Sequence, residues 1–505
     1  MSEAEAATST EIHSKPIIRF QMVGYLLAGI AIAIRLMMLL WTHSTTEDAL
    51  ITLRYAENIA HGNGFVYNSG QHVLGTTTPL YTLVLALFEF LHLNALAAGK
   101  FLNIAADGIT VYLISDILLR LGRPRSGWIA ALLYATASTS VNISIGGMET
   151  GLVTLFCTLA IAFYMKQNND GLFASLAILF LLRIDGLLLG VILLAAVFYR
   201  DKRLPIRSAL LALGIVLPWL IFTTVYFGSP IPASMVAKLT VYNRLITENL
   251  PNLSTFRTQF YAGPVQVVTT LLFVVGLITV IRKERSLVFA AGWLILYFGV
   301  MFVSKVPAFG WYFLPPLPIY YVLVGIGISS LFPQSSRSKM NFRVSSVALL
   351  ILGIPLVYHG KSIARDITNA QNLEDGVRRP IGEWLAGHNK EGDTVLLEPI
   401  GYIGYYSKLN VIDMVGLVSP EVLPYYRTQY QNPLGEMVDK FRPSYLVLRE
   451  SEVNRLSIYV TKAGRNLLEQ NYTPLRNESL HKAGNEFRIY KHKETNTNDL
   501  LPLKK

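Results

Sequence analysis

Long apolar stretches separated by short polar loops fill the first 360 residues of the chain. A helix needs about 20 apolar residues to cross the hydrocarbon core of a bilayer, and several stretches approach that length. The pattern therefore predicts a mainly α, polytopic membrane protein. The twelve apolar runs are Ile17–Trp41, Pro79–Leu93, Ala95–Leu121, Trp128–Ile145, Gly151–Met165, Leu172–Leu182, Gly186–Tyr199, Ile206–Phe227, Pro264–Ile281, Ser286–Val303, Phe313–Phe332 and Val344–Tyr358.

The pattern changes after Gly360. Short apolar runs at Thr394–Glu398 and Tyr445–Leu448 read as strands, and Pro380–Leu385 reads as a helix, with Gly, Pro and Asn between them. We expect a small extracytoplasmic α/β domain over residues 360–505, after a transmembrane module over residues 1–359. The chain has no P-loop, no GxGxxG after a strand and no zinc-ligand spacing, so nothing supports a phosphate cofactor or a zinc site.

Composition agrees with the pattern. The chain is 52% hydrophobic and only 15% charged, whereas soluble domains carry roughly 25% charged residues. This excludes an ordinary soluble enzyme. The net charge of +11 comes from short basic clusters between apolar runs, which we interpret as topology signals and not as a nucleic-acid surface. Cys157 is the single cysteine, so no intrachain disulfide forms.

The basic clusters also indicate which of the apolar runs cross the membrane. If all twelve runs crossed the membrane, with the N-terminus inside, the clusters would face outward, against the positive-inside rule. All become cytoplasmic if Pro79–Leu93, which contains Glu89 and His92, lies on the outer face. We therefore expect eleven spans in a plasma or inner membrane, a cytoplasmic N-terminus and a first outer loop over residues 42–93. The clusters are Arg120, Arg123 and Arg125; Lys166; Arg200, Lys202, Arg203 and Arg207; Arg282, Lys283 and Arg285; and Arg337, Lys339 and Arg343.

The unusual polar residues fall in the outer segments. Glu47 and Asp48 follow the first span directly, where charge is costly and usually paired. Adjacent carboxylates can share a divalent cation, or one can act as a general base. Ser44 and Glu47 also fit a helix capping box, so a structural role stays open.

Other outer segments add a carboxylate and two candidate contacts. Glu149 lies in the shortest outer loop, Gly146–Thr150, and is a third carboxylate. Thr77 belongs to a run of three threonines before Pro79, which either caps a helix or holds an anion or sugar hydroxyl. Tyr312 belongs either to an interfacial aromatic belt or to a sugar-stacking surface.

Cations accompany these groups. Arg183 and Asp185 share a turn and either pair with each other or serve a site. Lys238 either snorkels to the interface or binds a lipid phosphate. Jointly, carboxylates and cations on one side of a membrane suit a reaction in which a hydroxyl attacks and an anionic phosphate leaves.

The order of these motifs resembles that of the GT-C fold glycosyltransferases. It is most similar to the bacterial branch that looks like terminal arabinofuranosyltransferases, and more distantly similar to lipid A aminoarabinose transferases and protein O-mannosyltransferases. The matching stretches are Glu47–Tyr55, Gly62–Gly64, Gly75–Leu80, Gly147–Thr150, Arg183–Gly186, Gly228–Pro232 followed by Lys238, and Asp413–Leu417.

The resemblance implies roles for these residues. Asp48 would be the catalytic base and Glu47 its partner, and both would hold a divalent cation (Mg²⁺, Mn²⁺ or Ca²⁺) with Glu149. The chain departs from the usual pattern in having Glu-Asp where Asp-Asp is common, and Ile184 where proline often precedes the acid. The implied substrate contacts are Arg54, Tyr55, Thr77, Glu149, Arg183, Asp185, Lys238 and Tyr312.

The resulting hypothesis is an integral membrane hexosyl- or pentosyltransferase. It would take a sugar from a polyprenyl-phosphate donor and pass it, with inversion, to an extracytoplasmic glycan, lipid or protein of the cell envelope. The alternatives are a transporter or flippase of lipid-linked sugars, and a glycolipid-binding protein without activity. Transporters often show inverted repeats and interrupted helices, and the sequence indicates neither.

Overall fold

The computed structural model describes residues 3–246, 250–331, 365, 367–428, 430–461, 466–475 and 487–493, with side chains from residue 20 on. The expected span Val344–Tyr358 and the basic cluster from Arg337 to Arg343 lie outside these residues. The chain forms two compact units. Unit 1 takes residues 1–49, 77–230 and 248–370, and unit 2 takes residues 50–76, 231–247 and 371–505.

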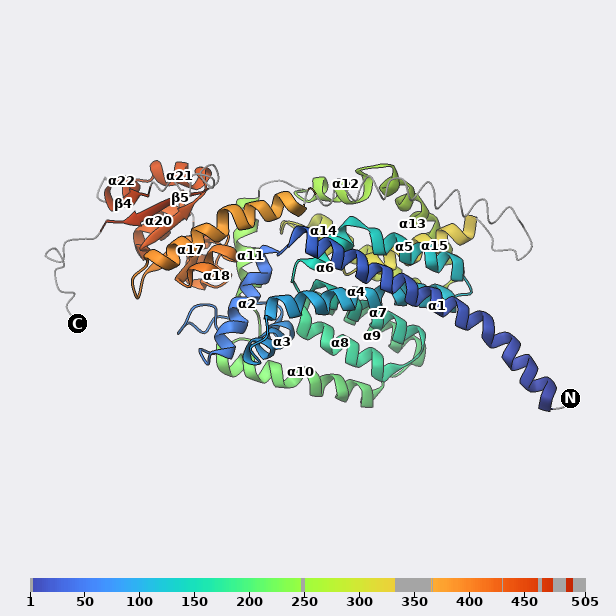
Figure 1. Ribbon diagram of the computed structural model, residues 1–505. Helices are drawn as coiled ribbons and strands as arrows, with labels where there is room; N and C mark the ends of the chain where they lie inside the picture. Colours follow the sequence, from blue (N-terminus) through green and yellow to red (C-terminus); the bar gives the residue numbers. More distant parts are fainter. Residues whose placement is uncertain are drawn as a thin grey trace. The chain divides into compact units, whose positions relative to one another are not determined.

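Unit 1 is helical (Figure 1). Helix α2 (Glu47–Ala60) begins in it and continues into unit 2 from residue 50. The apolar runs predicted from the sequence within the described residues are all helical. The other helices are α1 (Glu3–Thr42), α3 (Pro79–Phe90), α4 (Ala95–Arg120), α5 (Pro124–Thr136), α6 (Ser138–Ile145), α7 (Thr150–Met165), α8 (Asn169–Leu182), α9 (Leu187–Asp201), α10 (Ile206–Phe227), α12 (Leu253–Tyr261), α13 (Pro264–Lys283), α14 (Val288–Val303) and α15 (Leu317–Leu331), with short 3₁₀ turns η1 (Ile184–Gly186), η2 (Arg285–Leu287) and η3 (Gly310–Phe313).

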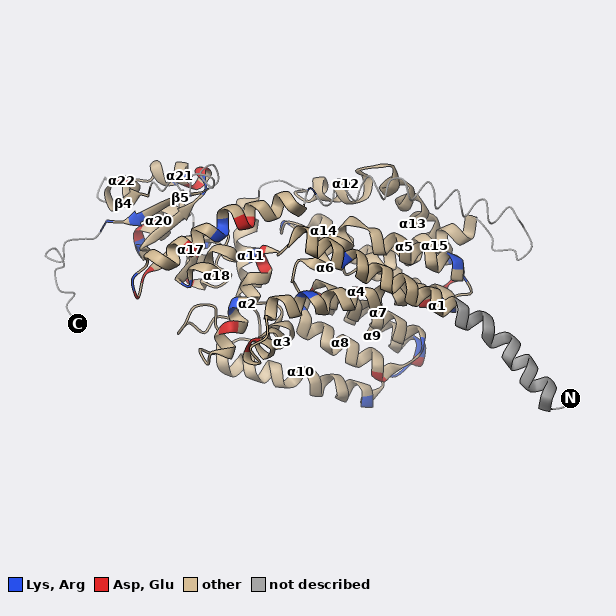
Figure 2. Ribbon diagram, viewed as in Figure 1, with Lys and Arg blue, Asp and Glu red and all other residues tan. Residues whose placement is uncertain are grey.

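Five of the described helical segments are long and apolar enough to cross a membrane, and six if α5 and α6 together count as one span. Figure 2 shows α10 with a charged residue at one end and none along the rest of the helix. Shorter apolar helices, α3 among them, complete the set. The protein is a multi-pass membrane protein, as its sequence predicts.

The described helices include an interruption that the sequence did not predict. Helices α5 and α6 meet at an angle of 54°, and Ala137 between them has an extended backbone (φ −63°, ψ 132°). The expectation of uninterrupted helices is therefore wrong at this point. No proline or glycine marks the break, which falls in the run Thr136-Ala137-Ser138. The side chains that hold it come from distant parts of the chain.

Ion pairs join several of the basic loops of unit 1. Arg123 Nη2 lies 2.8 Å from Glu284 Oε1, which joins the loop after α4 to the loop after α13. Lys166, after α7, lies 3.8 Å from Asp116 near the end of α4. These contacts bring three of the basic clusters together. Which face of the membrane they occupy stays a prediction from the sequence.

Within the described residues, unit 2 is built on a five-stranded mixed sheet of order β2-β1-β3-β5-β4. Strands β1, β2 and β3 are parallel, and β5 runs antiparallel to β3 and β4. The strands predicted at Thr394–Glu398 and Tyr445–Leu448 are β1 and β3, and the predicted helix is part of α17. The strands are β1 (Thr394–Leu397), β2 (Asn410–Asp413), β3 (Tyr445–Leu448), β4 (Tyr472–Pro474) and β5 (Arg488–His492).

Helices pack around this sheet, with a core that includes Leu396, Met437 and Leu446. They are α11 (Ala233–Leu245), α17 (Arg379–His388), α18 (Tyr402–Ser407), α19 (Leu423–Arg427), α20 (Pro433–Phe441), α21 (Glu450–Ser457) and α22 (Leu467–Asn471), with a π-turn η4 (Glu374–Arg378) and a 3₁₀ turn η5 (Pro420–Val422). The division of the chain near residue 360 stays a prediction. Segment 50–76 and α11 pack with the C-terminal part of the chain in unit 2.

Candidate functional site

Glu47 and Asp48 form the first turn of α2, where the positive end of the helix dipole favours carboxylates. Both are half-buried. Just before them, the Thr46 N–H donates to Gly146 O over 2.8 Å. This bond attaches the start of α2 to the Gly146–Thr150 turn, as a site made from these two predicted outer segments requires.

Lys100 is a cation that the sequence analysis missed. It lies in the second turn of α4 and is only 7% exposed. Its ammonium donates to Ser44 O and, over 2.8 Å, to Thr45 Oγ1. A buried ammonium therefore anchors the loop that leads into Glu47. Its sequence signal was a lone lysine inside the apolar run Ala95–Leu121.

The Gly146–Thr150 turn is fixed from its other side by α3 and α4. Gly147 has φ +87°, a conformation that favours glycine. Tyr81 Oη donates to Gly147 O over 2.7 Å and accepts from Asn103 Nδ2 over 3.2 Å. Asn103 Oδ1 in turn accepts the Leu152 N–H over 3.2 Å. The turn that carries Glu149 is thus rigidly supported by buried polar groups.

Arg183 joins two of the predicted carboxylates. Its Nη1 lies 2.9 Å from Glu149 Oε1, and its Nε and Nη2 each lie 3.0 Å from Asp185 carboxylate oxygens. The guanidinium also lies 5.1 Å from the centre of the Tyr312 ring, within range of a cation–π interaction. The structure therefore brings together four residues that the sequence placed on three separate segments.

The electrostatics of this cluster are dominated by burial. Glu149 is 2% exposed and Arg183 is 8% exposed. Burial raises the pKa of the Glu149 carboxyl, and the charge of Arg183 opposes that rise. One guanidinium serves two carboxylates, so the cluster carries a net negative charge when both are ionised. The sequence left open whether Arg183 pairs with Asp185. The structure shows that pair, and Glu149 is a second partner of Arg183.

Arg54 and Tyr55 lie within unit 2 and are buried. The Arg54 guanidinium donates to Tyr67 O over 2.9 Å and to Gly404 O and Leu409 O over 2.6 Å each. Tyr55 Oη accepts the Gly75 N–H over 3.0 Å. These bonds hold segment 50–76 within unit 2. A substrate contact for either residue stays a prediction.

Thr77 and Lys238 are each half-buried. Thr78 occupies the N-cap position of α3 but makes no side-chain capping bond, so the simplest reading of the threonine run, a cap by its last member, is not what the structure shows. Lys238 lies on α11, which follows Pro232. Within the described residues Lys238 forms no ion pair or hydrogen bond. Both residues stay predicted substrate contacts.

The Asp413–Leu417 motif builds a turn in unit 2. Asp413 is fully buried, and its carboxylate accepts the N–H groups of Val415 over 2.9 Å, Val418 over 3.3 Å, and Leu417. Burial raises the pKa of Asp413 to about 6, against the lowering effect of these three donors. The motif is therefore a structural turn at the end of β2.

The divalent cation expected from the sequence would be held by Glu47, Asp48 and Glu149. The part of the chain that the structure describes contains no group of three or more His, Cys, Asp or Glu side chains placed to hold a metal ion. Glu149, the third expected ligand, is bonded to Arg183. The described geometry does not assemble a three-carboxylate metal site from Glu47, Asp48 and Glu149.

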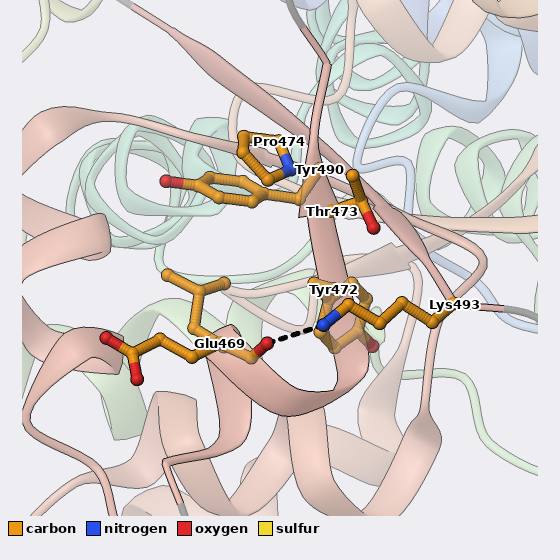
Figure 3. A pocket seen from close by; sticks show the side chains of 7 residues that line it. Glu469, Tyr472, Thr473, Pro474, Tyr490 and Lys493 are labelled. Atoms are coloured by element: carbon orange, nitrogen blue, oxygen red, sulfur yellow. Dashed lines mark hydrogen bonds between the residues drawn. The ribbon is translucent and has the colours of Figure 1, made fainter.

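A cavity of about 370 Å³ lies beside β4 and β5 in unit 2. Figure 3 shows Tyr490 next to Pro474, and the side chain of Lys493 extending to Glu469. Lys493 Nζ donates to Glu469 O over 2.6 Å. None of the site residues predicted from the sequence is among those that line this cavity, and it adds nothing to the candidate site.

Comparisons with known proteins identify the fold. ArnT from Cupriavidus metallidurans bound to undecaprenyl phosphate matches with a TM-score of 0.61 and 12% sequence identity, over 92% of this chain and 97% of that chain. The same enzyme in the apo state matches with a TM-score of 0.58 and 11% identity. The apo oligosaccharyltransferase of Archaeoglobus fulgidus matches with a TM-score of 0.56 and 12% identity, over 89% of this chain and 73% of that chain. The GT-C fold predicted from the motifs is confirmed.

Sequence comparisons match a smaller part of the chain than the structural comparisons do. A family model described as a domain of unknown function, DUF8728, matches residues 365–490. No curated protein sequence matches the chain. The family model covers a part of unit 2 and carries no information on function.

Proposed function

We propose that this protein is an integral membrane glycosyltransferase. It transfers a sugar from a polyprenyl-phosphate donor to an extracytoplasmic acceptor of the cell envelope, with inversion at the sugar carbon. The acceptor is a glycan, a lipid or a protein, and the sugar is a hexose or a pentose. The protein acts within the plasma or inner membrane, with its N-terminus in the cytoplasm and its C-terminal part outside.

One observation carries the proposal. The bond from Thr46 to Gly146 and the bond from Arg183 to Glu149 tie the start of α2, the turn before α7 and the turn before η1 into one region of unit 1. That region holds the Glu47–Asp48 pair and an arginine flanked by carboxylates. Support also comes from the fold, which is shared with an enzyme whose structure contains undecaprenyl phosphate.

The chemistry assigned to these residues is an acid–base displacement. Asp48 removes the proton from the acceptor hydroxyl, and Glu47 orients the Asp48 carboxylate. The acceptor oxygen then forms a bond to the anomeric carbon on the face opposite the phosphate. The bond between that carbon and the phosphate oxygen breaks, and polyprenyl phosphate leaves with the electron pair. Two negative charges accumulate on the departing phosphate, which calls for a fixed cation.

Arg183 suits the stabilisation of that charge. A guanidinium carries five N–H groups, and its hydrogen bonds within the described residues use three of them. Two N–H groups remain, on Nη1 and Nη2, in the forked geometry that matches a phosphate. Glu149 and Asp185 hold the fork in place. Lys238 is proposed as a separate contact to the lipid phosphate.

The divalent cation expected from the sequence stays a prediction. Because the described residues assemble no three-ligand site, the proposed reaction assigns no step to a cation. Dialysis against EDTA, followed by separate additions of Mg²⁺, Mn²⁺ and Ca²⁺, tests the point. Loss of turnover that one of these ions restores would establish the requirement.

A transporter or flippase of lipid-linked sugars is the second candidate. The break between α5 and α6 favours it, since transporters use interrupted helices. The deciding experiment supplies purified protein in nanodiscs with a panel of radiolabelled polyprenyl-phosphate sugars and envelope acceptors. We expect release of polyprenyl phosphate with at least one donor. No release with any donor, together with transfer of labelled lipid between leaflets in proteoliposomes, would support the transporter.

A further inference from the structure

An ion pair lies inside the helices of unit 1, outside the residues assigned to the reaction. Arg35 on α1 and Asp107 on α4 are both 0% exposed, and Arg35 Nε bonds to Asp107 Oδ2. Tyr134 on α5 donates to the other carboxylate oxygen, Asp107 Oδ1. Ser140 on α6 donates to Asp107 Oδ2 over 3.3 Å. Four helices therefore meet at one buried charge pair.

The complete burial of the Arg35–Asp107 pair needs a physical explanation. Two charges removed from water cost more free energy than their attraction returns unless the surrounding hydrogen bonds are complete. Here they are nearly complete, because Arg35 uses four of its five N–H groups within the described residues. Apolar side chains of similar volume would fill the same space at no loss of stability in many proteins. Such a pair is explained by the specific geometry that it holds.

That geometry is the break between α5 and α6. Arg35 Nη1 donates to Ala135 O over 2.8 Å, and Nη2 donates to Ser140 Oγ. In a continuous helix the Ala135 carbonyl would accept the N–H four residues later, but the 54° bend removes that partner. Arg35 replaces it. The Arg35 side chain therefore forms hydrogen bonds to residues on both sides of the break.

The break controls the direction of α6. This helix has eight residues and leads directly into the Gly146–Thr150 turn, whose Gly146 carbonyl accepts the Thr46 N–H. Met38, Val141 and Ile145 pack together between the break and the turn. Asp107 lies seven residues after Lys100 on α4, about 10 Å along the helix axis. The pair is thus about two helical turns from the loop ahead of Glu47.

We propose that Arg35 and Asp107 are positioning residues, which hold the α5–α6 break so that α6 presents the Glu149 turn to the start of α2. The part of this proposal that concerns turnover rests on the proposed function. The part that concerns the break does not. The pair touches no reacting group, so its removal should lower kcat and leave KM for the donor close to the wild-type value.

The test replaces the charges without leaving one of them unpaired. The double variant Arg35→Met with Asp107→Leu keeps the volume but frees Ala135 O and Ser140. Spin labels at Arg125→Cys on α5 and Asn142→Cys on α6, both exposed positions, report the angle of the break by electron paramagnetic resonance. The single native cysteine is buried, and Cys157→Ser gives a clean background. The matched control is Arg120→Met, which removes an arginine from a partly exposed Arg–Asp pair on α4.

We expect a folded double variant with a melting temperature close to that of the wild type, a broadened label-to-label distance distribution, and at least a tenfold lower kcat. If it does not fold, Arg35→Lys keeps the charge and loses the fork, and it should give the same broadening. A wild-type distribution in the folded double variant, or in Arg35→Lys, would overturn the proposal. If the wild-type protein turns over no donor, the distance measurement decides alone.

Discussion

Arg183 donates from Nη1 to Glu149 Oε1 over 2.9 Å, and this bond joins two turns that are 34 residues apart in the chain. The same guanidinium bonds to Asp185, so removing it would leave the buried Glu149 carboxylate and the half-buried Asp185 carboxylate without their shared cation. Most of the predictions for the site follow from this arrangement, because the arginine positions the carboxylates and the carboxylates hold the arginine fork.

Replacement of Arg183 by methionine should therefore do more than remove a phosphate contact. Loss of one partner of a buried pair typically costs about 3–5 kcal/mol. We expect a lower melting temperature and turnover reduced by at least about 100-fold, on the order of one lost oxyanion donor. Arg183→Lys keeps the positive charge but loses the forked guanidinium. Its melting temperature and turnover should both be closer to the wild-type values than those of Arg183→Met. Equal turnover in the wild type and Arg183→Met would remove Arg183 from the mechanism.

The pH dependence of turnover should report Glu149. Burial raises the pKa of its carboxyl, and Arg183 lowers it. If the reaction needs ionised Glu149, kcat/KM rises with pH through that pKa. Removing the guanidinium removes the lowering effect, so the acid limb should move to higher pH in Arg183→Met. Arg183→Lys should move it less. An acid limb at the same pH in all three proteins would show that Glu149 does not set it.

Lys100 should act through the loop that precedes Asp48. Its ammonium bonds to Ser44 and Thr45, and bonds from a charged donor are worth about 1.5–3 kcal/mol each. Lys100→Met should speed hydrogen exchange in a peptide over residues 43–60 and lower turnover about tenfold. Lys100→Arg is the matched control. Unchanged exchange in Lys100→Met would show that the loop is held by other contacts.

Asp413 should make unit 2 more stable in acid. Its pKa in the folded chain is raised to about 6, whereas an exposed aspartate has a pKa of about 3.9. Between these values the folded form binds more protons than the unfolded form, so the contribution of Asp413 to stability is fully present below about pH 4 and is lost, by up to about 3 kcal/mol, as pH rises through 6. Hydrogen exchange of peptides over β1 and β2 measures the change.

The control for this prediction is Asp413→Asn, which does not titrate. Its exchange should show a smaller loss of protection between pH 4 and pH 6 than the wild type does. Because asparagine cannot accept all three backbone N–H groups, this variant should also be less stable at every pH, by about 1–3 kcal/mol. The same loss of protection with pH in both proteins would exclude Asp413 as the titrating group.

The sequence predicted the fold because its signals are local. Apolar runs such as Ile206–Phe227 mark helices directly, and the short apolar run Tyr445–Leu448 marks a strand. The basic loops predicted which connections share an end, and the Arg123–Glu284 pair agrees. Physical rules on burial and charge act on each of these segments separately, so no knowledge of tertiary contacts was needed.

Features that depend on distant contacts were beyond the sequence. The α5–α6 break has no proline or glycine and exists where Arg35, 100 residues earlier in the chain, bonds to the Ala135 carbonyl. Lys100 looked like an isolated charge in an apolar run, and its loop partners lie more than 50 residues away. Arg54 showed no sign of the bonds that it makes to Gly404 and Leu409.

The central claim is that Asp48 activates an acceptor for attack on a polyprenyl-phosphate sugar. The most direct measurement compares the rate of polyprenyl phosphate release by the wild type and by Asp48→Asn, in nanodiscs, with donor and acceptor at saturation. A general base contributes about 10²–10⁴-fold, so the variant should be slower by that factor with an unchanged melting temperature. Release at the wild-type rate by Asp48→Asn would contradict the account.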